Sequence, residues 1–159
     1  MKKNIYVDFG YLIALCASFG GVVVLGALVA PVIFHPNAIL VDMNMDHYNS
    51  GILMGEIFRR FAYFINILVL GVVVYEVMMY KMGQRDAIVF ASAVTVIFSS
   101  LMFSVVYVPK ILAIQAIGPE ATQSDTFQNI HLASEFDFKI LAVALLVLFV
   151  RRLMLLRVK

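Results

Sequence analysis

Long apolar runs separated by short polar segments dominate the chain. Residues 9–34 and residues 87–108 contain no charged side chain. Two further runs, 55–80 and 130–150, are apolar over most of their length and carry polar side chains mainly near their ends. Each run can supply the roughly 20 residues that a helix needs to cross a bilayer. The pattern predicts an all-α, four-helix transmembrane bundle formed by one integral-membrane domain, residues 1–159.

Composition supports a chain surrounded by lipid. Apolar residues make up 63% of the sequence and charged residues 14%, which are too few to cover a soluble surface. The mean hydropathy is +0.97. A net charge of +2 gives no reason to expect nucleic acid as a partner. The single cysteine, Cys16, excludes an internal disulfide framework.

The distribution of lysine and arginine predicts the orientation. Cytoplasmic loops are enriched in these residues, so the richer side is expected to face the cytoplasm. We therefore expect both termini inside, residues 35–55 and 110–128 outside, and a multi-pass protein of a bacterial inner membrane. Eight basic residues lie on the inner side (Lys2, Lys3, Lys81, Arg85, Arg151, Arg152, Arg157 and Lys159) and four on the outer side (Arg59, Arg60, Lys110 and Lys139).

The second apolar run opens with an unusual polar stripe. Glu56, Arg59, Tyr63 and Asn66 fall near one helical face, and Arg60 lies beside the first turn of this stripe. Ionisable groups at the edge of a membrane span are costly unless they have a partner, a water-filled cavity or a route to the headgroups. This stripe is therefore a candidate functional site.

Further polar residues are predicted at the same depth on the other helices. One interpretation is a set of ion pairs between helices, for example Arg59 or Arg60 with Glu135, that fix helix register. The other is a polar, outward-facing cavity that binds a ligand, ion or metal. Besides the stripe, the predicted cluster contains Lys110, His131, Ser134, Glu135 and Lys139.

The loop before the second run has the side chains of a soft metal site. Met43 and Met45 are two residues apart, His47 follows, and His35 lies at the end of the first run. Thioethers and imidazole suit Cu(I), so copper is one candidate ligand. The alternative is a loop that dips into the headgroup region and binds no metal.

Enzymatic chemistry has little support. Two histidines can ligate a haem, but the chain has no Cys-x-x-Cys-His motif and no evident pair of histidines on facing helices. It also lacks a Ser-His-Asp order, a Gly-rich phosphate loop and a His-Glu-x-x-His motif. We predict no catalytic residues, and a haem-binding enzyme is only the third alternative.

Three short motifs resemble a known family. They are Ala30-Pro31-Val32-Ile33-Phe34, the stretch from Ser50-Gly51 through Gly55 to Tyr63, and Phe127-x-x-x-His131-x-x-Ser134. The chain resembles the domain of unknown function 4149, found in small bacterial four-helix membrane proteins and in eukaryotic transmembrane protein 205. The resemblance implies a four-span fold without an assigned reaction, and the architecture is similar to that of copper-resistance membrane domains. The family often has arginine where this chain has His35.

Two function classes remain open from the sequence. The first is a membrane protein that handles a metal or small ligand at a periplasmic-side site lined by Arg59, His131 and Glu135. The second is a non-catalytic structural or accessory subunit of a larger membrane complex, or a homo-oligomer, in which the same charges dock a partner.

Overall fold

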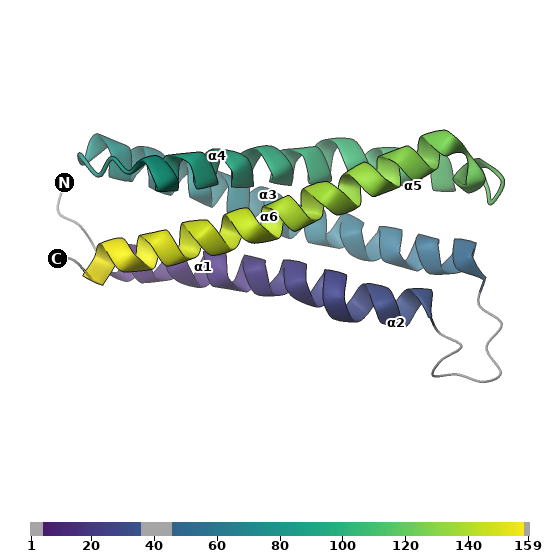
Figure 1. Ribbon diagram of the computed structural model, residues 1–159, viewed down its shortest axis with the longest axis horizontal. Coiled ribbons are helices and arrows are strands. Elements are labelled where there is room, and N and C mark those ends of the chain that lie inside the picture. The colour runs from purple at the N-terminus through teal and green to yellow at the C-terminus, as the bar shows by residue number, and fades with distance from the viewer. Residues whose placement is uncertain (1–4, 36–45, 158–159) are drawn as a thin grey trace.

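Four long helical rods lie side by side in the computed structural model, which describes residues 5–35 and 46–157 (Figure 1). The first and third rods are each built from two α-helices joined by a π-helical segment. The rods are α1 (Ile5–Val24), η1 (Leu25–Val29) and α2 (Ala30–Phe34); α3 (His47–Lys81); α4 (Ala87–Leu101), η3 (Met102–Tyr107) and α5 (Val108–Gln115); and α6 (Asp125–Arg157), preceded by the 3-10 turn η4 (Ala121–Gln123).

The all-helical prediction is confirmed, and three of the rods have the length and composition of membrane spans. They cover Ile5–Phe34, His47–Lys81 and Ala87–Gln115. The fourth rod, α6, has 33 residues and carries more charged side chains than these three. The chain is therefore an integral membrane protein, and the predicted fourth span is not among the three.

Both ends of the bundle are defined by where the rods turn. The beginning of α1, the end of α6 and the tight turn between α3 and α4 lie at one end, which we call the terminal end (left in Figure 1). The α5–α6 connection and the beginning of α3 lie at the other, which we call the loop end. Gly83 in the tight turn has φ of 82°, a left-handed conformation that glycine adopts without a steric penalty.

The helices begin at capping residues that differ from the sequence prediction. The Asp46 carboxylate accepts a hydrogen bond of 2.7 Å from the Asn49 backbone N–H, so α3 starts at His47 instead of Gly55. The expectation that residues 47–54 form an outer loop was therefore wrong. At α6 the Ser124 hydroxyl accepts from the Phe127 N–H at 3.3 Å, so Ser124 caps the helix that begins at Asp125.

Both π-helical segments end two residues before a proline that the helix passes through. Pro31 and Pro109 have no N–H, and a proline ring clashes with the carbonyl four residues earlier. Those carbonyls belong to Ala27 in η1 and Val105 in η3. The wider π turn relieves this clash, and so the third rod continues through Pro109 to Gln115.

Aromatic rings fill the core below the loop end. Phe103 of η3 is 2% exposed, and its ring centroid lies 5.0 Å from Phe138 of α6 and 5.4 Å from Phe58 of α3. Phe61 completes the group at 6.4 Å from Phe103. This group, the phenylalanine cluster, joins three rods and fixes where the polar side chains of the loop end are placed.

Candidate functional site

A cavity of about 470 Å³ opens at the loop end, above the phenylalanine cluster. Its wall comes from α2, α3, α5, η4 and α6, and none of its lining residues carries a permanent charge. One part of the wall is apolar, and another presents hydroxyl, amide and imidazole groups. The lining residues include Phe34, Phe58, Phe127 and Leu132 on the apolar part and His47, Tyr48, Gln115, Thr122, Gln128 and His131 on the polar part.

Gln115 is the most deeply buried polar residue of this cavity. Its side chain is 7% exposed, and its Oε1 atom has no hydrogen-bond partner among the described residues. The backbone carbonyl of Gln115 accepts a hydrogen bond of 2.7 Å from the Tyr48 hydroxyl, which ties the end of α5 to the beginning of α3. A buried acceptor without a partner costs about 1–3 kcal/mol, and a ligand donor at this position would remove that cost.

Two glycines of α3 make the space that the Gln115 amide occupies. A Cβ on Gly55 would lie 2.7 Å from Gln115 Oε1 and 3.0 Å from a Leu112 methyl group, and one on Gly51 would lie 3.3 Å from Gln115 Nε2. The Ser50-Gly51 to Gly55 stretch therefore serves close packing against α5. Sequence reasoning missed Gln115, for which the available signal was a single amide inside the apolar stretch 111–117.

Two of the predicted site histidines reach the cavity wall. His131 is half-buried, and its ring lies parallel to that of Phe127 with a centroid distance of 6.0 Å. His47 is exposed at the beginning of α3, with its ring 5.2 Å from Phe34. Ser134 donates a hydrogen bond of 2.7 Å to the His131 carbonyl and is buried one turn further along α6.

The predicted charged stripe does not line this cavity. Arg59 donates to Glu56 at 2.7 and 2.9 Å and to the Tyr63 hydroxyl at 3.3 Å, and Arg60 donates to Glu56 at 2.8 Å. These groups lie on the outer face of α3, where Tyr63 is 62% exposed. These four residues form a local network within one helix, whereas Asn66 of the stripe accepts a hydrogen bond of 2.8 Å from Ser104 of η3.

The ion pair predicted between Arg59 or Arg60 and Glu135 was wrong. Glu135 accepts a hydrogen bond of 2.7 Å from Lys139, one turn away on α6, and both side chains are exposed. Partners four residues apart on one helix meet without any tertiary contact, so these charges are satisfied before the helices pack. Lys110 is exposed and does not line the cavity.

The metal-site predictions are only partly covered by the structure. Met43 and Met45 lie outside the described residues, so copper binding by this loop stays a prediction. His35 is exposed, and its Nδ1 is 3.1 Å from the Pro31 carbonyl oxygen. The described ranges 5–35 and 46–157 hold no group of three or more His, Cys, Asp or Glu side chains placed to share a metal ion.

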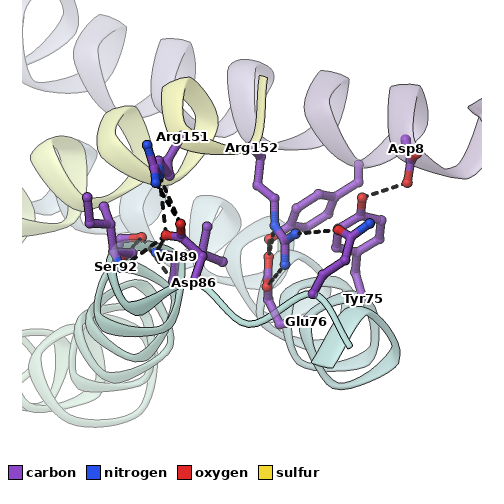
Figure 2. A network of polar contacts seen from close by, with 11 residues as sticks. Asp8, Tyr75, Glu76, Asp86, Val89, Ser92, Arg151 and Arg152 are labelled. Atoms are coloured by element: carbon purple, nitrogen blue, oxygen red, sulfur yellow. Dashed lines mark hydrogen bonds and ion pairs between the residues drawn. The ribbon is translucent and has the colours of Figure 1, made fainter. Parts of the chain in front are cut away.

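A buried polar network lies at the terminal end, where the sequence predicted no site (Figure 2). Arg152 of α6 is 4% exposed, forms an ion pair with Glu76 of α3, and donates to Gln84 at 3.3 Å. Tyr11 of α1 donates to the same Glu76 carboxylate at 2.8 Å. Arg152, Glu76 and Tyr11, which we call the arginine network, therefore connect α1, α3 and α6.

A tyrosine pair extends this network to a second carboxylate. The Tyr11 and Tyr75 rings stack with a centroid distance of 3.8 Å, and the Arg152 guanidinium lies 5.3 Å from the Tyr75 centroid. Tyr75 donates to Asp8, a buried residue of α1, at 2.7 Å. The sequence did contain a signal for this network. Asp8 and Glu76 are acidic residues at the terminal end of two apolar runs, and Arg152 is predicted at the same depth.

A second ion pair at the terminal end joins the α3–α4 turn to α6. Arg151 donates to Asp86 at 2.7 Å, and Asp86 also caps α4 by accepting from the Val89 N–H at 3.0 Å (Figure 2). The Arg151 guanidinium, followed by the helix N–H groups, lowers the pKa of Asp86 from about 3.8 to about 2. The Asp86 carboxylate is therefore charged at every physiological pH.

Acid should remove the stabilisation that Asp86 provides. Because the folded-state pKa is lowered, this stabilisation is complete above about pH 4 and disappears as the pH falls toward about 2. Asp86→Asn keeps a capping oxygen and removes the charge. Thermal unfolding of detergent-solubilised protein should show the parent more stable than Asp86→Asn at pH 6, with the difference closing between pH 4 and pH 2. A difference that does not change over this range would contradict the role of the Asp86 charge.

Comparison with known protein families identifies the family of this chain. The family model described as domain of unknown function (DUF4149) matches residues 13–120, which is more than half of the chain. The chain belongs to this family. Neither a curated protein nor a solved structure matches it.

The DUF4149 match covers only part of the cavity and part of the arginine network. It includes Gly51, Gly55 and Gln115 of the cavity and Glu76 of the arginine network. It ends before α6, which contributes His131 to the cavity and Arg152 to the network. The family description states no activity, and the relation to transmembrane protein 205 stays a prediction.

Proposed function

We propose that this DUF4149 protein crosses a bacterial inner membrane four times, with both termini in the cytoplasm and the cavity open to the periplasm. The α6 rod has 33 residues, enough at 1.5 Å per residue for roughly 50 Å. Its Glu135 and Lys139 neutralise each other, and its Arg151 and Arg152 are both paired. The enrichment of basic residues at the terminal end supports the orientation.

We further propose that the protein binds a small, uncharged amphiphile in the cavity and has no catalytic role. The observation that carries this proposal is the buried Gln115 Oε1, an acceptor with no described partner in the wall of a 470 Å³ cavity. This oxygen is closed off against Gly55 in the structure, so a ligand hydroxyl or amide N–H would satisfy it after the Gln115 side chain turns into the cavity. The absence of permanent charge from the wall favours a neutral ligand, since a charged one would lose its hydration without a counter-ion.

The rest of the wall defines the shape of the ligand. Phe34, Phe58 and Phe127 offer aromatic faces against which a ring or short alkyl chain can pack. The imidazole of His131 and the amide of Gln128 offer further polar contacts. Apolar walls with a few polar groups are the usual composition of small-molecule sites. The cavity thus suits a molecule with an apolar body and one hydrogen-bonding head.

An alkylphenol is a direct probe of this site, because its hydroxyl can donate to Gln115 and its ring can pack on phenylalanine. In Gly55→Ala the new methyl group meets Gln115 Oε1 at 2.7 Å and displaces the amide. We expect the affinity for 4-butylphenol to fall about tenfold, or about 1.4 kcal/mol. Equilibrium dialysis of the protein in nanodiscs, with empty nanodiscs to subtract partitioning into lipid, measures this change.

Gly71→Ala is the matched control, since it lies on the same helix and its Cβ would meet nothing within 4 Å. It should leave affinity unchanged and raise helix stability slightly, as expected for glycine to alanine in a helix. Gln115→Leu keeps the side chain's approximate size and removes the acceptor, so it should abolish the specific signal. Equal 4-butylphenol binding by the parent and Gln115→Leu, or binding no greater than in empty nanodiscs, would refute the proposal.

A further inference from the structure

A second cavity, of about 690 Å³, lies between α3 and α4 at the terminal end. We call it the inner groove. Its mouth is formed by the α3–α4 turn and includes Lys81, Gln84, Arg85 and Asp86. Arg152 and Glu76 of the arginine network line one side. The inner groove is separate from the ligand cavity, which lies at the opposite end of the bundle.

The mouth of the inner groove carries two cations without an acidic partner. Its acids are already matched, since Glu76 pairs with Arg152 and Asp86 with Arg151. Lys81 is exposed and forms no ion pair with any described residue. Arg85 likewise has no acidic partner in the described ranges, so this mouth has an excess of positive charge.

Arg85 is held where it can use its hydrogen-bond donors. Its guanidinium lies over the ring of Tyr80, 4.7 Å from the centroid. Stacking occupies the face of the guanidinium plane and leaves the N–H groups around its edge available. Those groups suit the oxygens of a phosphate, which arginine binds in a fork geometry. Lys81 adds a second cation at the same mouth.

The floor of the inner groove is apolar and follows the two helices into the membrane-spanning region. It is formed by Val73 and Val77 of α3 and by Phe90, Ala93, Val94 and Ile97 of α4. At 1.5 Å per residue, the lining extends roughly 12 Å along α3 from Lys81 to Val73 and roughly 15 Å along α4 from Ala87 to Ile97. These lengths accommodate much of a fatty acyl chain.

We propose that the inner groove binds an anionic phospholipid from the leaflet at the terminal end. The phosphate would lie between Lys81 and Arg85, and one acyl chain would lie along Val77 and Val94. The charge at the mouth complements the phosphate, and the apolar floor begins directly below it. Basic pockets between membrane helices favour anionic headgroups for this electrostatic reason. The site does not depend on the ligand proposed for the cavity at the loop end.

Native mass spectrometry of the purified full-length protein, with phosphatidylglycerol or phosphatidylcholine added at equal concentration, tests the proposal. The parent should retain one phosphatidylglycerol at least fivefold more than one phosphatidylcholine. The double variant Lys81→Gln, Arg85→Gln should retain the two lipids equally. The matched control, Arg60→Gln with Lys110→Gln, removes two exposed cations at the loop end and should keep the fivefold preference.

A second pair of variants tests the apolar floor. Val77→Phe adds a ring inside the groove and should reduce retention of both lipids at least threefold. Val74→Phe adds the same ring on α3 at a 60% exposed position outside the groove lining and should change neither. Lys81 and Arg85 are surface residues, so their single glutamine variants should fold even if Val77→Phe does not. Each single variant should show a reduced preference for phosphatidylglycerol over phosphatidylcholine.

Three results would overturn the proposal. The first is equal retention of the two lipids by the parent. The second is an unchanged preference for phosphatidylglycerol in the Lys81→Gln, Arg85→Gln variant. The third is displacement of the retained lipid by an equal concentration of glycerol 3-phosphate, which would show that the charged mouth binds phosphate without using the apolar floor.

Discussion

Replacing Arg152 with leucine should lower the free energy of unfolding by about 3–5 kcal/mol, because it leaves a buried carboxylate without its counter-ion. Arg152 is 4% exposed, and the Glu76 side chain is 14% exposed. Tyr11 would still donate to Glu76, but one neutral hydroxyl does not balance a buried charge. SDS titration followed by circular dichroism measures the loss of stability.

The double variant Glu76→Leu, Arg152→Leu separates the ion pair from simple packing. It removes both charges, so neither is left alone, and it should be less destabilised than Arg152→Leu by itself. Some loss should remain, because the Tyr11 hydroxyl then has no acceptor at position 76. Additive effects of the two single changes would contradict a coupled, buried pair.

The neighbouring arginine is a matched control for this result. Arg151 pairs with Asp86, but its side chain is 33% exposed and lies where solvent and headgroups can replace the partner. Fully exposed pairs contribute about 0–1 kcal/mol, and this partly exposed pair should lie closer to that range than a buried one, so Arg151→Leu should cost less than Arg152→Leu. Comparable losses for the two adjacent residues would show that burial does not set the energy of these pairs.

Replacing Phe103 with alanine should cost roughly 3 kcal/mol, because it opens a cavity where three helical rods meet. In water-soluble proteins phenylalanine to alanine in a core costs about 3–5 kcal/mol. The lower end applies here, since lipid itself solvates apolar groups and only packing is lost. The Phe103 ring contacts those of Phe58 and Phe138, and no single neighbour can fill the space it leaves.

Phe98→Ala provides the comparison for Phe103→Ala on the same rod. Phe98 is 62% exposed on α4 and faces the surroundings of the bundle, so its removal leaves no internal cavity. Its loss should change the SDS concentration at the unfolding midpoint only slightly. A similar shift for both variants would mean that the phenylalanine cluster does not carry the packing energy of this region.

The sequence by itself determined that the chain is helical and belongs in a membrane. Uninterrupted apolar runs such as 9–34 and 87–108 leave few alternatives, because a backbone in lipid must satisfy its own hydrogen bonds. The sequence also indicated a polar site at the loop end, and His131 does reach the cavity there. Helix limits were less well determined, since α3 starts two turns earlier than predicted.

Only the tertiary structure decided which charges meet. Arg59 and Glu135 share a predicted depth, but each has an opposite charge on its own helix within four residues, and these local partners satisfy them. Arg152 has no such acidic neighbour on α6, and it therefore reaches Glu76, 76 positions away in sequence. Gln115 was missed for a related reason, because its burial depends on the missing side chains of Gly51 and Gly55 on another helix. Depth along a helix can be counted from the sequence, but the direction in which each helix faces is set by packing.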